Sequence, residues 1–297
     1  MTHDNEYSKF ARALLRWHST QGRHNLPWQK KQTAYRVWLS EIMLQQTQVK
    51  TAIPYFNKFV AKYQTIGDLA NADIDEILKL WEGLGYYSRA RNMYKTALIV
   101  SSDFAGRFPK TIHGLMSLPG IGRSTAGAIL SLAFQIPTAI LDGNVKRVLT
   151  RYHAITGWPG DAKTEKKLWA FAEEYTPSIH IRNYTQAIMD LGATLCTRSS
   201  PSCSKCPLNS DCVAYNNGIV SKFPEKKVKK IKQRDLHLCV ITNQKNEIVL
   251  IQRAPKGLWG GLWCFPEKTE GTGVNTLLES LGIGKAKKIK QLTPFNH

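Results

Sequence analysis

The stretch from Leu118 to Asp142 places the strongest constraint on how this chain folds. It begins with a tight turn, Pro119-Gly120-Ile121-Gly122, and continues into a small-residue helix that starts near Ser124. Two glycines in such a turn leave backbone N–H groups uncovered at the start of a helix, an arrangement that binds phosphate. The chain then returns through an apolar segment to one carboxylate, Asp142. The sequence therefore predicts two helices joined by a turn, either an ordinary connection or a hairpin that grips phosphate.

The charge of the chain favours a polyanionic partner. Among 297 residues, 41 Lys and Arg outnumber 22 Asp and Glu, which gives a formal net charge of +19. Such an excess is typical of proteins that bind nucleic acid, although a basic protein without such a partner is the alternative. The sequence has no membrane-spanning apolar run and no signal-peptide pattern at its polar N-terminus. We therefore expect a cytoplasmic protein, bacterial in type and nucleoid-associated, with reduced cysteines.

Helical periodicity dominates the chain up to about residue 215. The expected helices cover 5–21, 35–60 with an interruption at Pro54, part of 65–80, 89–104, 112–118, 144–152, 164–175 and 184–195. Lysines then concentrate in residues 222–234, and apolar runs predict strands at 238–241 and 248–251. This order predicts a mostly α domain over 1–215, a basic linker over 216–234 and a smaller unit with strands over 235–297.

Two carboxylates are candidates for acid–base chemistry. Glu41 lies in the mostly apolar segment Val37–Leu44, where burial would raise its pKa and let it hold a proton near neutral pH. A solvated Glu on the outer face of a helix is the alternative. Asp142 begins a helical stretch, so it is a helix cap, a catalytic carboxylate, or both. One protonated and one ionised carboxyl group would together suit cleavage of a glycosidic bond.

Two short segments have the composition of nucleic-acid contacts. Gln45, Gln46 and Thr47 follow Glu41 by one helical turn and would contact bases, fill the space left by a displaced base, or form a polar helix face. Tyr86 lies between glycines and two arginines, where it would wedge between bases or pack at a helix junction. The residues alone leave these alternatives open.

Four clustered cysteines indicate a metal centre. They follow the spacing C-x6-C-x2-C-x5-C and are Cys196, Cys203, Cys206 and Cys212. Four thiolates also bind zinc, but the chain has one C-x2-C pair where common zinc ribbons have two, which favours an iron–sulfur cluster. Cys239 and Cys264 fall outside this spacing, and we expect them to be small buried apolar residues.

These motifs occur in an order that resembles a known family. The segments SEIMLQQTQV, GLGYYSRARN, LPGIGRSTAGAI and LDGNVKRVL and the four cysteines are similar to those of the helix-hairpin-helix DNA glycosylases of the endonuclease III superfamily. Within it, the chain most resembles the MutY-type adenine DNA glycosylases. The resemblance implies a two-lobed, mostly α helix-hairpin-helix DNA glycosylase fold, with a six-helix lobe over about 26–136 and an iron–sulfur lobe over 1–25 and 137–215. It also implies a 4Fe-4S cluster held by the four cysteines.

The resemblance implies a role for each motif. Glu41 would be the general acid that protonates adenine, and Asp142 would stabilise or capture the sugar cation with help from Asn144. Gln46 would enter the duplex, Tyr86 would wedge beside a damaged guanine, and Leu26 and Trp28 would line the base pocket. The residues expected to contact DNA are Gln45, Gln46, Thr47, Tyr86, Leu118, Pro119, Gly120, Ile121, Gly122 and Ser124.

Ser124 separates two branches of this superfamily. Bifunctional members carry there a Lys that forms a Schiff base with the sugar, so Ser124 implies base excision without strand cleavage, although Lys146 would give weak lyase activity. The implied partner is double-stranded DNA with adenine opposite 8-oxoguanine or guanine, bound by a monomer. The alternatives are an endonuclease III-like pyrimidine or mismatch glycosylase and a non-catalytic iron–sulfur DNA-binding protein.

The C-terminal unit resembles the start of a Nudix-type domain, which adenine glycosylases append to read 8-oxoguanine. The similarity lies in Leu258–Pro266, and no acidic set of the REx2Ex2E type follows, so a pyrophosphohydrolase is not expected. In the family a Phe/Ser/His recognition loop would continue from about Pro294. We therefore expect a partial α+β domain that exposes strand edges and the Trp259–Trp263 cluster, and is cleavable near Lys226–Lys232.

Overall fold

A computed structural model describes residues 7–227, 235–254, 257, 260–268, 273–284 and 286–294 of the chain. The chain divides into two compact units, Met1–Val228 and Lys229–His297. Part of the expected linker and cleavage region (228–234), Trp259 and residues 295–297 lie outside the described residues. Within the described ranges, no helix is both long enough and apolar enough to cross a membrane.

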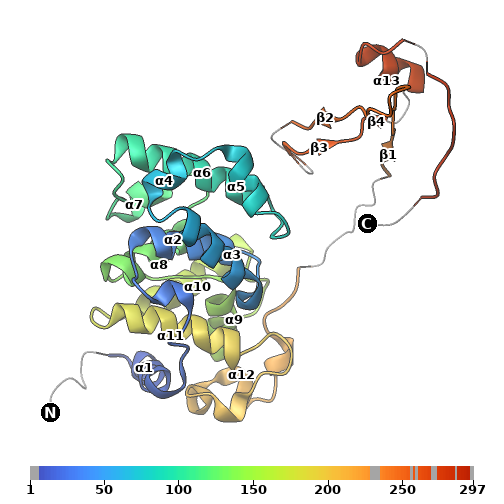
Figure 1. The fold of residues 1–297 in the computed structure, drawn as a ribbon. Coiled ribbons are helices and arrows are strands. Elements are labelled where there is room, and N and C mark those ends of the chain that lie inside the picture. Colours follow the sequence, from blue (N-terminus) through green and yellow to red (C-terminus); the bar gives the residue numbers. More distant parts are fainter. Residues whose placement is uncertain are drawn as a thin grey trace. The chain divides into compact units, whose positions relative to one another are not determined.

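The first unit is built from helices and short helical turns (Figure 1). Polar side chains that accept hydrogen bonds from backbone N–H groups begin many of them, including Ser8, Thr33, Thr65 and Asp142. The helices are α1 (Lys9–Gln21), α2 (Ala34–Leu44), α3 (Val49–Lys62), α4 (Ile66–Ala70), α5 (Ile74–Leu80), α6 (Ser88–Asp103), α7 (Ile112–Met116), α8 (Arg123–Ile129), α9 (Gly143–Tyr152), α10 (Ala162–Tyr175), α11 (Ile181–Thr194) and α12 (Val213–Asn216). A π-helical turn, η2 (Leu130–Phe134), extends α8, and 3-10 turns cover Pro27–Gln29, Cys203–Lys205, Asn209–Asp211 and Val220–Lys222.

The helices of this unit form two groups. In one, α2 contacts α3, α6 and α8, while α4 and α5 pack on α6 and α7 packs on α8. In the other, α9 contacts α10, α11 and α12, and α1 from the start of the chain lies beside α11 (Figure 1). The turn η2 contacts both α8 and α11 and so connects the groups.

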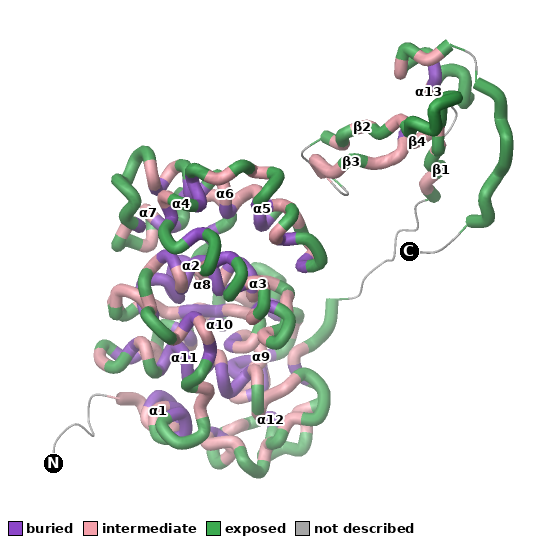
Figure 2. The backbone as a smooth tube through the Cα atoms, viewed as in Figure 1, coloured by how far each residue is buried: buried purple, intermediate pink, exposed green. Residues whose placement is uncertain are grey.

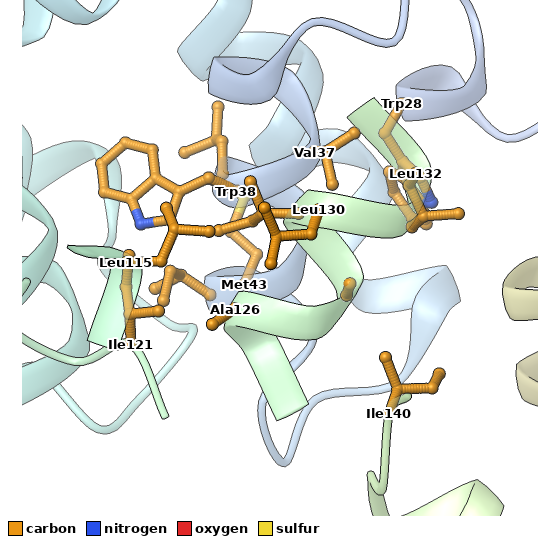
Figure 3. Close-up of a cluster of buried hydrophobic side chains, with 14 of the residues drawn as sticks. Trp28, Val37, Trp38, Met43, Leu115, Ile121, Ala126, Leu130, Leu132 and Ile140 are labelled. Atoms are coloured by element: carbon orange, nitrogen blue, oxygen red, sulfur yellow. The ribbon is translucent and has the colours of Figure 1, made fainter. Parts of the chain in front are cut away.

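Apolar side chains from α2 and α8 form the centre of the first group. Figure 3 shows Val37, Trp38 and Met43 of α2 near Ala126 of α8 and Leu130 of η2. Trp38 and Met43 are completely buried. Figure 2 shows that the buried positions of the first unit lie on the inward faces of its helices. This core fixes the position of α2, the helix that carries Glu41.

The long helix expected over 35–60 is two helices, and its break is not at Pro54. Pro54 lies inside α3, whereas α2 ends at Leu44 and the chain turns through Gln46, whose φ of 58° is left-handed. The carbonyl oxygens at the end of α2 accept hydrogen bonds from Arg89 of α6. Such a long-range interaction leaves no trace in the periodicity of residues 35–60, which is why the prediction was wrong here.

The second unit contains short strands and one helix among its described residues: β1 (His237–Leu238), β2 (Ile251–Gln252), β3 (Trp263–Cys264), β4 (Glu267–Lys268) and α13 (Val274–Ser280). β1 pairs antiparallel with β4, with His237 opposite Lys268, and β2 pairs antiparallel with β3, with Ile251 opposite Cys264. The expected strands 238–241 and 248–251 therefore form regular ladders only at their ends, with one isolated bridge between Thr242 and Ile248.

The expected burial of Cys239 and Cys264 was wrong. Both thiols are only partly buried. The Sγ atom of Cys264 lies 3.2 Å from Nε of Arg253, a polar contact rather than an apolar one. Two-residue strands cover little surface, since Val240 and Leu250 remain 52% and 47% exposed, so this unit offers no deep interior at those positions.

Candidate active site

Glu41 lies on α2 between side chains that are almost fully buried. Ser40, Ile42 and Met43 are each at most 2% exposed. Glu41 as a whole residue keeps some exposure, but its carboxyl group is densely packed. No described residue forms a hydrogen bond or ion pair with this group. Burial raises the pKa of Glu41 to about 8, and the nearby Asp142 carboxylate also raises it. Glu41 therefore holds a proton at neutral pH and can donate it.

Asp142 caps the N-terminus of α9. Its Oδ1 accepts a hydrogen bond from the backbone N of Val145 (2.9 Å), and its Oδ2 accepts one from Nδ2 of Asn144 (3.0 Å). Burial raises the pKa of this carboxyl group, but these hydrogen bonds and the positive charge of Arg147 act in the opposite direction. Asp142 is thus a helix cap whose partners stabilise its ionised form, so the two roles left open by the sequence are compatible.

The two carboxyl groups interact electrostatically although 100 residues separate them in the sequence. The negative charge of Asp142 raises the pKa of Glu41. Glu41 lacks the hydrogen-bond donors that favour the ionised form of Asp142, so Glu41 is the member of this pair better suited to hold a proton.

The segment before Asp142 is fixed against α8. A Cβ atom on Gly127 would lie 2.4 Å from the carbonyl oxygen of Ala139, so only glycine allows this close approach. The hydroxyl of Ser124 accepts a hydrogen bond from the backbone N of Leu141 (3.0 Å). Ser124, expected to contact DNA, thus has an internal role in positioning Asp142.

The glycine turn connects α7 to α8 and is anchored by apolar side chains. Leu118 and Ile121 are 2% and 5% exposed, so their side chains face the core and only their backbone groups can reach a ligand. The carbonyl oxygen of Pro119 accepts a hydrogen bond from Oγ1 of Thr96 (2.9 Å). Gly120 has a φ of 79°, and Gly122 is exposed with no atom within 4 Å of an added Cβ.

The segments of Gln45–Thr47 and Tyr86 lie on either side of Arg89. Gln46 is exposed and Tyr86 is 61% exposed. Both have left-handed backbone conformations, with φ of 58° and 49°. The polar helix face considered for Gln45–Thr47 is wrong, because this segment is the loop between α2 and α3. Its residues and Tyr86 are therefore available to contact a ligand.

Leu26 and Trp28 are buried rather than open to a pocket. They are 9% and 6% exposed, and the Trp28 ring packs edge-on against Phe56 with centroids 5.4 Å apart. Figure 3 draws Trp28 within the cluster of buried apolar side chains. Their expected role as pocket walls stays a prediction.

Arg147 belongs to the site, although the sequence analysis did not identify it. Its Nη2 donates to Oδ1 of Asn144 (2.8 Å) and to the carbonyl oxygen of Gly192 (2.7 Å), while its Nε donates to the carbonyl oxygen of Cys196 (2.7 Å). Asn144 is thereby held between Asp142 and Arg147. The spacing of three residues between Asn144 and Arg147 was the available signal, because such pairs meet on a helix.

The four motif cysteines line one partly open cavity. Arg151 also lines it, and its Nη1 lies 3.4 Å from Sγ of Cys196. Burial and the neighbouring thiols raise the pKa of Cys206 to about 12. No three His, Cys, Asp or Glu side chains of the described residues lie close enough together to hold a single metal ion. The four thiols, with the cation of Arg151 beside one of them, are the side chains of this cavity that could hold a metal centre.

Comparisons with known proteins agree with this arrangement. Residues 39–174 match the HhH-GPD superfamily of base excision DNA repair proteins, and residues 237–297 match the NUDIX domain. The adenine DNA glycosylase of Buchnera aphidicola from Schizaphis graminum is 44% identical over 97% of this chain and 83% of its own length. The chain belongs to the adenine DNA glycosylase family.

This family assignment extends to distant relatives and to the fold. The human adenine DNA glycosylase is 35% identical over 89% of this chain and 58% of its own length. A thermostable thymine-DNA glycosylase has a similar structure, with a TM-score of 0.64 and 29% identity over 70% of this chain and 95% of that one. The predicted family and the predicted mostly α helix-hairpin-helix fold with a small Nudix-like unit are confirmed.

Proposed function

We propose that this chain removes adenine from double-stranded DNA by hydrolysing its N-glycosidic bond, and that it does so as a monomer without cleaving the strand. The observation that carries the proposal is the pairing of Glu41, whose pKa burial raises to about 8, with an Asp142 carboxyl group that accepts hydrogen bonds from Val145 and Asn144. The family assignment supports adenine as the base. The proposed substrates are duplexes with adenine opposite 8-oxoguanine or guanine.

In the proposed reaction the adenine is first turned out of the duplex. Glu41 donates its proton to a ring nitrogen, so that the electron pair of the breaking C1′–N bond leaves with a neutral base. The sugar becomes an oxocarbenium-like cation, and the Asp142 carboxylate stabilises its charge. A water then adds to C1′ and releases a proton, and Glu41 recovers its own proton from solvent.

Ser124 supports the absence of strand cleavage. Its hydroxyl is engaged with the backbone of Leu141, and a Schiff base requires an amine at the sugar. The amine of Lys146, four residues after Asp142, is engaged in an ion pair with Glu165 at 2.7 Å.

The test uses duplexes that carry A:8-oxoguanine, A:G and T:G pairs, with and without alkali after the reaction. We expect strand breaks only after alkali and only in the adenine-containing duplexes. Excision of thymine but not adenine would instead identify a mismatch glycosylase of the kind represented by the thymine-DNA glycosylase. No excision from any duplex would leave a DNA-binding protein without this activity.

We further propose that Cys196, Cys203, Cys206 and Cys212 hold a 4Fe-4S cluster. The cavity that they line and the cation of Arg151 beside Cys196 support it, since a cluster with four thiolates carries net negative charge. A bound cluster would hold the loop after α11 in place. Iron and sulfide analysis of protein purified without oxygen tests this, and stoichiometric zinc without iron would overturn it.

The second unit is proposed to contact the base opposite adenine. Its match to the NUDIX domain supports such a separate role, while Glu41, Asp142 and the cysteines all lie in the first unit. A chain that ends at residue 227 should therefore still excise adenine but distinguish A:8-oxoguanine from A:G less well. Equal discrimination by the short and the full chain would contradict this assignment.

A further inference from the structure

Arg89 lies at the start of α6, is 8% exposed, and binds the end of α2. Its Nη1 lies within hydrogen-bonding distance of four acceptors on that side. They are the carbonyl oxygens of Ile42 (3.1 Å), Met43 (3.0 Å) and Gln45 (2.6 Å) and the Oγ1 of Thr47 (3.2 Å). Carbonyl groups at a helix C-terminus have no partners within the helix, so this cation completes the end of α2.

The same guanidinium binds the turn that carries Tyr86. Its Nη2 donates to the carbonyl oxygens of Leu84 (3.1 Å) and Gly85 (3.2 Å). Its carbon Cζ lies 5.6 Å from the centroid of the Tyr86 ring and 5.2 Å from that of Trp81. One planar cation therefore joins two loops that are separated by some forty residues of chain, a geometry that suits the fork of donors on arginine.

Each of the two loops contains an exposed residue with an unfavourable backbone conformation. Gln46 and Tyr86 have φ of 58° and 49°, in the left-handed region that residues other than glycine rarely adopt. Such conformations persist where the surrounding structure fixes them, and they concentrate at functional sites. Tyr86 is 61% exposed, so its own side-chain packing does not hold it there. Arg89 instead binds Leu84 and Gly85, which directly precede Tyr86. It also binds Gln45 and Thr47, which flank Gln46.

We propose that Arg89 is a positioning residue that sets the separation and direction of Gln46 and Tyr86, the two side chains that would enter the duplex. The inference rests on the proposed function, because it assumes that these loops meet DNA. It assigns base extrusion to a pair of loops coupled through one buried cation rather than to two independent wedges. Arg89 does not touch the reacting atoms, and its effect passes through the loops.

Arginine and lysine should differ at this position. The two Nη atoms of Arg89 face different loops, one toward α2 and one toward Leu84 and Gly85. A lysine keeps the charge but has a single nitrogen, which can serve one loop at a time. We therefore expect Arg89→Lys to be intermediate between the unchanged chain and Arg89→Met.

The experiment measures extrusion separately from binding. The full-length chain carrying Glu41→Gln, which cannot excise, is mixed with a duplex that has 2-aminopurine in place of the target adenine opposite 8-oxoguanine. The fluorescence of 2-aminopurine rises when it unstacks. Affinity for an undamaged duplex is measured in parallel. Arg91→Met is the matched control, because Arg91 lies two residues further on α6 and its guanidinium forms no hydrogen bond or ion pair with the described residues.

We expect Arg89→Met to lose most of the fluorescence rise while its affinity for the undamaged duplex changes by about twofold, and Arg91→Met to keep the rise. With Glu41 restored, the single-turnover rate of Arg89→Met should fall by about 100-fold, the scale of effect produced by a small misplacement of positioning groups. A purely structural role would lower the melting temperature without separating extrusion from binding.

Unchanged fluorescence and rate in Arg89→Met would overturn the proposal, and so would an equal loss in Arg91→Met, which would point to charge alone. If Arg89→Met does not fold by circular dichroism, Arg89→Lys carries the test, and a full rise and full rate in that variant would overturn the proposal. Failure of the unchanged chain to excise adenine would refute the proposed function, whereas the fluorescence comparison would still report on the coupled loops.

Discussion

The last turn of α2 and the first turn of α9 each bury one carboxyl group, but only the second stabilises its ionised form. Glu41 lies near the C-terminal end of α2, where backbone N–H groups are already used within the helix and the helix dipole disfavours negative charge. Asp142 lies at the N-terminus of α9, where a free N–H group and Asn144 bind its oxygens. Burial raises both pKa values, but only Asp142 has partners for its ionised form.

This difference shows how a helical protein can make an acid and an anion from the same chemical group. The position of a carboxyl group along its helix decides whether unpaired backbone donors are available to it. Neither α2 nor α9 needs an unusual side chain to achieve this.

The largest effect is expected from Glu41→Gln. Glutamine keeps the size of the side chain but cannot donate the carboxyl proton, and general acid catalysis is typically worth roughly 10²- to 10⁴-fold. We expect the single-turnover rate of adenine release to fall by at least this much, with duplex affinity retained. Rapid-quench measurement on an A:8-oxoguanine duplex provides the test.

Glu174→Gln is the matched control for this change. Glu174 lies exposed on α10, so the same loss of a carboxylate there should leave the rate unchanged. A normal rate in Glu41→Gln would remove Glu41 from the mechanism, whatever the control does.

Local sequence was enough to predict the burial of Glu41 and the helix that Asp142 caps. The apolar neighbours of Glu41 and the helical pattern after Asp142 are adjacent in the chain, so their physical effect could be read there. The break at Gln46 could not, because it depends on Arg89 from another helix. The internal bond of Ser124 to the backbone of Leu141 was hidden for the same reason.

The family resemblance supplied what local patterns could not, but at the level of roles rather than contacts. It placed Leu118 and Ile121 in a DNA-binding turn, whereas the structure shows that their side chains anchor that turn in the core. It also gave no indication that Arg147 joins Asn144 to Cys196. Such links are made by side chains that meet only after the helices have packed.

The pH dependence of excision should report the two pKa values. Excision needs Glu41 protonated, so the single-turnover rate should decline above about pH 8, where Glu41 ionises, by about tenfold per pH unit. It also needs Asp142 ionised, so the rate should decline again in acid, at a pH above the ordinary range of an aspartate because burial raises this pKa. Rates in buffers of constant ionic strength measure both limbs.

Asp142→Asn sharpens this test. It removes the negative charge that raises the pKa of Glu41. The remaining excision rate of this variant should therefore begin to decline at a lower alkaline pH. An alkaline limb at the same pH in this variant would show that the two carboxyl groups do not interact.

A smaller effect is expected from Gly192→Ala on α11. An added Cβ would lie 2.6 Å from Cβ of Asn144 and 3.0 Å from its Cα, so the start of α9 must shift. Displacing Asn144 and Asp142 should lower the excision rate by about tenfold, within the range that misplaced groups produce. Gly67→Ala on α4 is the control, because its added Cβ meets nothing closer than 3.6 Å and should preserve the rate. Equal rates in both variants would show that α9 tolerates the shift.

The smallest effect concerns the stability of Glu41→Gln, which should increase although its activity is lost. The pKa of Glu41 is about 8 in the folded chain and near 4.5 when unfolded, so between these values the folded state holds a proton that the unfolded state has released. The free energy of unfolding therefore decreases as the pH rises from 4.5 to 8. Glutamine does not titrate, so the free energy of unfolding of Glu41→Gln lacks this decrease with pH.

We expect Glu41→Gln to raise the free energy of unfolding at pH 7 by roughly 1–3 kcal/mol, since one pKa unit corresponds to about 1.4 kcal/mol and the residue keeps some exposure. The melting temperature should rise by about 2–4 °C for each kcal/mol in a unit of this size. Calorimetry at pH 5 and pH 7.5 tests the cause, because the advantage of the variant should nearly vanish at the lower pH. An equal advantage at both values would mean that the buried charge of Glu41 is not what destabilises the folded chain, and the contrast between α2 and α9 would then lie in reactivity alone.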